Sequence, residues 1–139
     1  MSEVWNIGRA LAKFYAALAA GGSLRGQRLL SPDIIKAIYS HQSPAQGQDS
    51  SSWGLGFQLL NFGATRGIGH PGMGGSIGLC SPDHQLAVGI TVNRLSISQF
   101  LGEAGVTEVL IQHICQELKI PAPSNLGKPA IPSSSKSDL

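Results

Sequence analysis

Hydrophobic residues near the N-terminus recur every three or four positions, which is the spacing of one face of an α-helix. They predict an amphipathic helix over roughly residues 3–20, with five apolar positions on one side: Ile7, Leu11, Phe14, Tyr15 and Leu18. Gly21 and Gly22 are expected to end this helix, because glycine readily adopts the left-handed conformation of a helix C-terminus.

A second, shorter helix is predicted from its start signals. Ser31 is a suitable N-cap, Pro32 suits the first helical position, and Asp33 lies in the first turn. This helix is expected to run to about residue 39 and to point three isoleucines inward: Ile34, Ile35 and Ile38. The polar stretch at residues 40–52 then predicts a surface loop.

From Trp53 the hydrophobic pattern changes to a period of two, which is typical of β-strands. Alternate apolar residues fall in two runs: Trp53, Leu55, Phe57 and Leu59, then Leu86, Val88, Ile90 and Val92. A turn is expected at residues 81–84. The pattern therefore predicts an antiparallel meander of three strands, at residues 53–62, about 67–80 and 85–93.

A last helix is predicted at about residues 104–118, ended by Pro121, with five apolar residues on one side: Val106, Val109, Leu110, Ile114 and Leu118. The order of elements indicates an α+β fold, an antiparallel sheet flanked by helices, because no βαβ unit repeats. Residues 1–120 are expected to form this domain. Residues 121–139, rich in proline and serine, are expected to be a disordered tail.

Composition narrows the classes of function. The chain of 139 residues is 42% hydrophobic and 13% charged, which suits one packed domain. A scattered net charge of +2 gives no basic stripe for nucleic acid. No apolar run approaches the ~18 residues of a membrane span, and no secretory signal is visible, so a soluble, intracellular chain of open compartment is the default. Cys80 and Cys115 are expected to be reduced thiols.

The glycine-rich run GIGHPGMGGSIG, at residues 67–78, is the densest candidate for a functional segment. Its first half fits the dinucleotide pattern G-x-G-x-x-G, but no helix or suitably spaced acidic residue follows. Neither a nucleotide nor another cofactor is therefore expected. A metal site is not expected either, because the nearby candidate ligands lack a recognised spacing: His70, Cys80, Asp83 and His84.

The second half of this run fits the nucleophile elbow G-x-S-x-G around Ser76. Ser76, Asp83 and His113 also occur in the order serine, acid, histidine that α/β-hydrolases use. An elbow needs a helix after its serine, whereas the residues after Ser76 predict a strand. A serine esterase with Ser76 as nucleophile is thus the less favoured alternative.

Four segments together carry a wider pattern: GRALAKFYAALAAGG, SLRGQRLLSPDIIKAI, WGLGFQ and GHPGMGGSIGLCSPDHQLAVGITVNR. They resemble the C-terminal region of the serine β-lactamase-related family, which includes class C β-lactamases, penicillin-binding-protein-like D-alanyl-D-alanine carboxypeptidases and related esterases. The resemblance covers roughly residues 6–118. It implies the C-terminal portion of the β-lactamase/transpeptidase-like fold, and therefore an incomplete domain.

Residues 69–72, Gly-His-Pro-Gly, are similar to the His-x-Gly (HxG) form of the family's Lys-Thr-Gly strand motif. By this resemblance His70 would face the cleft, and Gly72 would leave room for an acyl group. The backbone N–H of Met73 would form half of an oxyanion hole. Pro71 stands where the family often has a hydroxyl residue, and so removes a donor. From the residues alone, His70 also fits an ordinary strand-edge histidine, and the glycines fit a bulge or tight sheet packing.

The family's nucleophile and proton shuttle are missing from this sequence. The family uses Ser-x-x-Lys and Tyr-x-Asn or Ser-x-Asn motifs; the sequence has only Ser133-Ser134-Ser135-Lys136, in the expected tail, and neither shuttle motif. No complete catalytic set is therefore predicted. Either the chain is the C-terminal piece of a longer hydrolase acting on a small ester, amide or lactam, or it is a non-catalytic fragment that associates with its missing N-terminal half or another chain.

Overall fold

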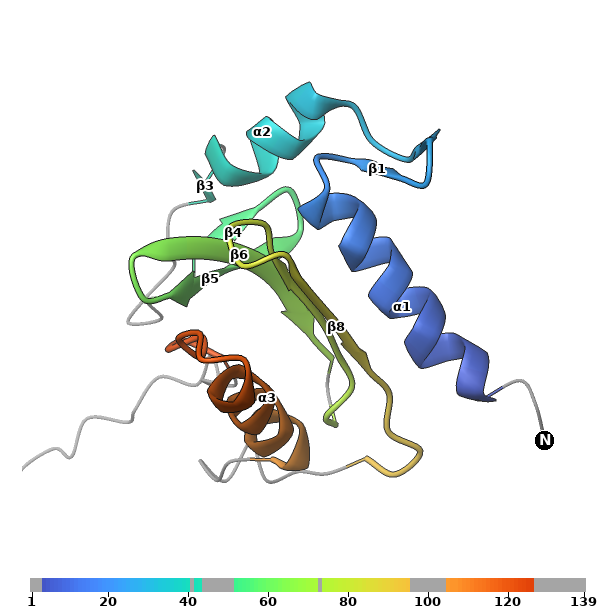
Figure 1. Cartoon of the computed structure of the whole chain (residues 1–139), viewed down its shortest axis with the longest axis vertical. Helices are drawn as coiled ribbons and strands as arrows, with labels where there is room; N and C mark the ends of the chain where they lie inside the picture. Colours follow the sequence, from blue (N-terminus) through green and yellow to red (C-terminus); the bar gives the residue numbers. More distant parts are fainter. Residues whose placement is uncertain (1–3, 41, 44–51, 73, 96–104, 127–139) are drawn as a thin grey trace, which may run out of the picture.

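An antiparallel β-sheet forms the middle layer of this computed structural model (Figure 1). The structure describes residues 4–40, 42–43, 52–72, 74–95 and 105–126. Six strands make the sheet: β3 (Gln42–Ser43), β4 (Trp53–Gly54), β5 (Phe57–Phe62), β6 (Thr65–Pro71), β7 (Ile77–Ser81) and β8 (Leu86–Ile90). They lie in chain order, and each strand pairs antiparallel with the next.

Helices cover both faces of this sheet (Figure 1). The helices α1 (Val4–Ala19) and α2 (Pro32–Ser40) lie on one side, joined by the small hairpin of β1 (Ser23–Leu24) and β2 (Gln27–Arg28). The helix α3 (Val106–Glu117) lies on the other side. The predicted α+β class, the three helices and the antiparallel sheet are confirmed.

The alternation of side chains along the strands divides the hydrophobic core into two clusters, because successive strand residues point to opposite faces. The cluster under α1 and α2 contains Tyr15, Leu18, Ile38, Leu59, Ile68 and Cys80. The cluster under α3 contains Leu60, Phe62, Ile77, Leu79, Leu86, Ile111 and Cys115. The strand β8 contributes Leu86, Val88 and Ile90 to the cluster under α3 and Ala87 to the cluster under α1 and α2, and is therefore packed on both faces.

Two glycines allow α1 to lie very close to the sheet. A Cβ atom added at Gly89 would lie 2.6 Å from the backbone atoms Ala12 N and Gly8 O. A Cβ atom at Gly78 would overlap the ring of Tyr15. These positions therefore serve the packing of the helix, and a side chain on either strand would push α1 away.

The single strand predicted at residues 53–62 is in fact a hairpin. Leu55 and Gly56 form a two-residue turn between β4 and β5, with φ angles of 47° and 87°. Leu55 is 55% exposed and does not share a buried face with Phe57. Alternation alone missed this turn, because leucine is rarely found in the left-handed conformation that the turn requires. The strand predicted at about 67–80 is likewise two strands, β6 and β7, joined by a turn at residues 72–76.

The predicted inner face of α3 is wrong. Val106, Val109, Leu110 and Leu118 are exposed, and only Ile114 of the five predicted residues packs against the core. The helix instead buries Thr107, Glu108, Ile111 and Cys115. Two overlapping stripes fit the helical period here, and spacing alone could not choose between them. On α2, Ile38 is buried as predicted, whereas Ile34 is exposed.

The chain continues to pack beyond α3. Asn125 is buried, and both polar atoms of its side-chain amide bond to the backbone of β5. Nδ2 donates to Leu59 O at 2.8 Å, and Oδ1 accepts from Asn61 N at 3.0 Å. Residues 121–126, placed in the tail by composition, thus lie against the sheet. The physical reason is one asparagine that satisfies backbone groups of β5. Residues 127–139 lie outside the described residues.

None of the helices in the described ranges has the length and apolar content needed to cross a membrane.

Candidate functional site

The strand β6 places His70 at its C-terminal end, next to the turn that leads into β7. His70 pairs with Gly78 and Pro71 pairs with Ile77 across the two strands. The His70 side chain is exposed, and its neighbour across the ladder has no side chain. This end of β6 therefore presents an exposed imidazole, while the ring of Tyr15 occupies the space beside Gly78.

The turn at residues 72–76 depends on its glycines. Gly72 N donates a hydrogen bond to Ser76 O at 2.7 Å, and Gly75 N donates to Gly72 O at 3.2 Å. Gly74 and Gly75 have φ angles of 89° and 112°, a region that residues with a side chain rarely adopt. A Cβ atom at Gly72 would lie 2.9 Å from Ser76 O, so the turn itself excludes a side chain there.

Two contacts fix this turn to the rest of the molecule. The hydroxyl of Thr107, at the start of α3, donates a hydrogen bond to Gly75 O. On the other side, Val92 N donates to Ser76 Oγ at 3.2 Å. The turn is therefore held between α3 and the segment after β8, rather than projecting freely.

Trp53 is the aromatic neighbour of His70. The two ring centroids are 5.5 Å apart and the ring planes meet at 68°, an edge-on arrangement. Trp53 comes from β4, two strands away in sheet order. From the sequence, Trp53 is predicted only as a strand residue and Thr107 only as part of a helix, because neither contact follows from local spacing.

The residues of the nucleophile-elbow alternative do not converge in the structure. The strand β7, not a helix, follows Ser76, and the Ser76 hydroxyl is bonded to Val92 N. Asp83 lies in the turn at the opposite end of β7, a strand about 16 Å long. His113 is exposed on α3. This geometry does not support Ser76 as a triad nucleophile.

The candidate metal ligands are also dispersed. His84 Nε2 lies 3.0 Å from Thr65 Oγ1, and Cys80 is fully buried in the cluster under α1. Burial raises the pKa of the Cys80 thiol to about 12, so this sulfur is protonated at neutral pH. Within the described ranges no group of three or more metal-ligating side chains occurs.

Met73, the expected oxyanion-hole donor, lies outside the described residues. The Ser-x-x-Lys match at residues 133–136, which was not assigned to the site, also lies outside them. The glycine run also does not form a dinucleotide cradle, because its first half is the strand β6 and no helix follows it.

An antiparallel sheet flanked by helices on both faces defines an α+β domain. The beta-lactamase family model matches residues 3–107. The chain belongs to the beta-lactamase family.

Two known proteins are similar to this chain in sequence or structure. Esterase/beta-lactamase LipL from Mycobacterium tuberculosis (strain ATCC 25618 / H37Rv) is 30% identical over 120 residues, covering 80% of this chain and 28% of LipL. The crystal structure of a family VIII carboxylesterase superposes with a TM-score of 0.51 at 30% identity, covering 64% of this chain and 26% of that one. The chain thus spans little more than a quarter of the length of these relatives.

Proposed function

We propose that this chain supplies one wall of the acyl-transfer site of a longer serine hydrolase, an esterase of the β-lactamase-related type. The observation that supports it best is the His-Pro-Gly segment at the exposed end of β6, beside a turn in which Gly72, Gly74 and Gly75 have no side chain. Membership of the beta-lactamase family and similarity to two esterases agree with this role.

In the proposed mechanism, His70 hydrogen-bonds the substrate or the residue that shuttles its proton. The three glycines of the turn let the acyl group lie against the strand, and the backbone N–H of Met73 donates to the developing oxyanion. Trp53 packs against the imidazole edge and restricts its orientation. The substrate class is a small-molecule ester, amide or lactam.

The nucleophile belongs to another part of the longer protein in this proposal. The sequence holds one Ser-x-x-Lys match, at residues 133–136, and neither shuttle motif. The chain alone is therefore expected to be inactive, because a cleft wall without a nucleophile cannot form an acyl-enzyme.

Two surfaces suit the rest of the longer protein. The outer edge of β8 has no partner strand within the described residues, so its backbone can accept another strand. The exposed apolar stripe of α3, defined by Val106, Val109, Leu110 and Leu118, can pack under an added helix. The same surfaces support the second candidate, a non-catalytic fragment that pairs with another chain.

Labelling with a fluorophosphonate, read by intact mass, tests the first part of the proposal. The isolated chain is expected to carry no adduct, and an adduct on Ser76 would contradict the assignment. A longer product with an in-frame Ser-x-x-Lys motif is expected to carry one adduct on that serine and to hydrolyse p-nitrophenyl butyrate. The second candidate function, a non-catalytic fragment that pairs with another chain, is supported instead if no such upstream motif exists and the chain co-purifies with a partner protein.

The role of His70 is tested in the active, longer protein. The substitution His70→Ala is expected to lower kcat/KM by about 100-fold, the usual effect of losing a residue that assists proton transfer. His84→Ala is the matched control, because His84 contacts Thr65 at the other end of β6. Equal activity in the two variants would remove His70 from the mechanism.

A further inference from the structure

The helix α1 and the β1–β2 hairpin enclose a hollow that the proposed acyl site does not use. Its volume is about 420 Å³, within the usual size range of small-molecule sites. Six side chains that line it matter to the argument: Lys13, Phe14, Leu24, Arg25, Gln27 and Leu29. None of them comes from β6 or the turn that follows it.

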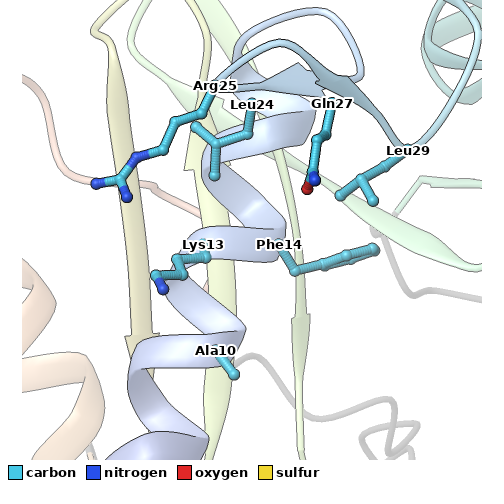
Figure 2. A pocket seen from close by; sticks show the side chains of 7 residues that line it. All are labelled: Ala10, Lys13, Phe14, Leu24, Arg25, Gln27 and Leu29. Carbon is cyan, nitrogen blue, oxygen red and sulfur yellow. The ribbon is translucent and has the colours of Figure 1, made fainter.

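The hollow has a cationic side and an apolar side. Figure 2 shows the side chains of Lys13 and Arg25 on one side, and those of Phe14 and Leu29 on the other. Leu24 and Gln27 point from the hairpin toward the helix between them. Phe14 and Leu29 are 38% and 53% exposed, which leaves apolar surface open to a ligand.

The charge around this hollow is strongly one-sided. The segment from residue 4 to residue 30 carries Arg9, Lys13, Arg25 and Arg28, and it contains no aspartate or glutamate. The whole chain has a net charge of only +2. The hollow therefore lies in a local field that attracts anions, with two of the four cations at its rim.

Arg25 occupies a position that arginine does not favour. The pair Leu24–Gln27 closes a two-residue turn, and its central residues Arg25 and Gly26 have φ angles of 50° and 80°. Such turns prefer Asn-Gly, because asparagine tolerates the left-handed region and most side chains do not. A strained cation at the rim of a hollow is a feature that local folding does not explain.

We propose that this hollow binds an amphipathic monoanion, a carboxylate on an aliphatic chain of about six to ten carbons. Lys13 and Arg25 bind the carboxylate through charge-assisted hydrogen bonds, and Gln27 adds a donor. Phe14, Leu24 and Leu29 cover the aliphatic chain. This site is separate from the acyl site and does not depend on the proposed function.

Titration of the full chain with monomeric decanoate, followed by calorimetry, tests the site. Decanoate is expected to bind with submillimolar affinity, whereas acetate and decanol bind far more weakly because each lacks one half of the ligand. Lys13→Gln and Arg25→Asn are each expected to weaken binding about threefold, in line with exposed ion pairs. Leu29→Ser is expected to weaken decanoate binding as well.

The control substitutions separate binding from folding. Asparagine suits the left-handed conformation, so Arg25→Asn keeps the turn and does not lower the melting temperature. Arg9→Gln removes the same charge from α1 outside the hollow and is expected to leave affinity unchanged. Equal losses in Arg9→Gln and Lys13→Gln would overturn the site, as would no decanoate binding. Binding only to anionic phospholipid vesicles would assign the basic segment to a lipid surface instead.

Discussion

At Gly89 the backbone of β8 touches the backbone of α1. Alanine at this position would place its Cβ 2.6 Å from Ala12 N and Gly8 O, and backbone atoms cannot move aside as a flexible side chain can. We expect Gly89→Ala to lower the free energy of unfolding by about 2 kcal/mol, the usual effect of overpacking. Urea denaturation of the two proteins measures it.

Gly8 provides the matched control for this contact. A Cβ atom at Gly8 would lie 3.5 Å from Gly89 O and Thr91 Oγ1, which is ordinary contact, and alanine favours the helical conformation. Gly8→Ala is expected to stabilise the chain by about 0.5–1 kcal/mol. No loss of stability in Gly89→Ala would mean that α1 does not lie as close to β8 as described.

Two buried groups that lose a proton at high pH, the Cys80 thiol and the Tyr15 hydroxyl, make the stability of the chain depend on alkaline pH. Burial raises the pKa of Cys80 from 9.0 to about 12 and that of Tyr15 from 10.0 to about 12; the nearby Cys80 adds a smaller effect at Tyr15. Because the folded state holds these protons more tightly than the unfolded state, stability is full below about pH 9. It falls as the pH rises from about 9 to about 12.

The substitution Cys80→Ala checks this assignment. It removes one of the two thiols that titrate first in the unfolded chain. Burial also raises the pKa of Cys115, so the fall in stability still begins near pH 9, but it is expected to be shallower between about pH 9 and 12 than in the parent chain. Urea unfolding at a series of pH values gives the two curves, and their shapes are compared because the substitution also changes the packing. Identical slopes above pH 9 would show that Cys80 does not contribute to the fall in stability.

At the level of single residues, the sequence predicts only the part of the proposed site that a motif marks. His-Pro-Gly leads to His70 and Gly72, whereas nothing in the sequence indicates that Trp53 contacts His70 or that Thr107 bonds to the turn. The contact between Trp53 and His70 arises because β4 folds back on β5 through a two-residue turn. No property of tryptophan in a local window indicates which distant side chain it will meet.

Among the secondary-structure elements, the β4–β5 turn offers a direct test of its unusual residue. Leu55 has a φ of 47° and is largely exposed. Replacing Leu55 by asparagine is expected to stabilise the chain by about 1 kcal/mol, because asparagine tolerates this left-handed conformation better than leucine. Leu55→Ser removes the same apolar surface, but serine does not favour the left-handed conformation as asparagine does. We therefore expect Leu55→Ser to raise the free energy of unfolding by less. A loss of stability in Leu55→Asn would contradict the turn.

The helices were predicted more accurately than the strands, for a physical reason. Helix ends carry local signals, and the expected N-cap is present: Ile34 N donates to Ser31 Oγ at 3.3 Å. The hairpin turns depend instead on left-handed residues that sequence preference disfavours. The buried face of α3 depends on which partner it meets, and Thr107 is buried there because it bonds to Gly75.

On the scale of the whole molecule, the sheet edge at β8 and the stripe on α3 leave the domain open on one side. Val106 is 74% exposed, and the stripe would normally be covered in a stable domain. We expect the isolated chain to self-associate at micromolar concentrations. The double substitution Val106→Lys, Val109→Glu is expected to reduce this association without lowering the free energy of unfolding, as measured by sedimentation velocity and urea denaturation.

Two exposed polar residues of the same helix serve as the control. Gln112→Lys with Gln116→Glu introduces the same charges on α3 outside the stripe, and it is expected to leave the self-association unchanged. A monomeric parent chain at tens of micromolar would show that these surfaces do not drive association.

The hydrogen bond between Thr107 and the turn at residues 72–76 also has a consequence for synthesis. The two partners are 32 residues apart, so the donor leaves the ribosome well after the turn that it holds. The sheet strands on either side of the turn pair locally and early, whereas the turn receives its last support only when α3 docks. A nascent chain that ends before residue 107 therefore has β6 and β7, but the turn between them lacks its hydrogen bond to α3.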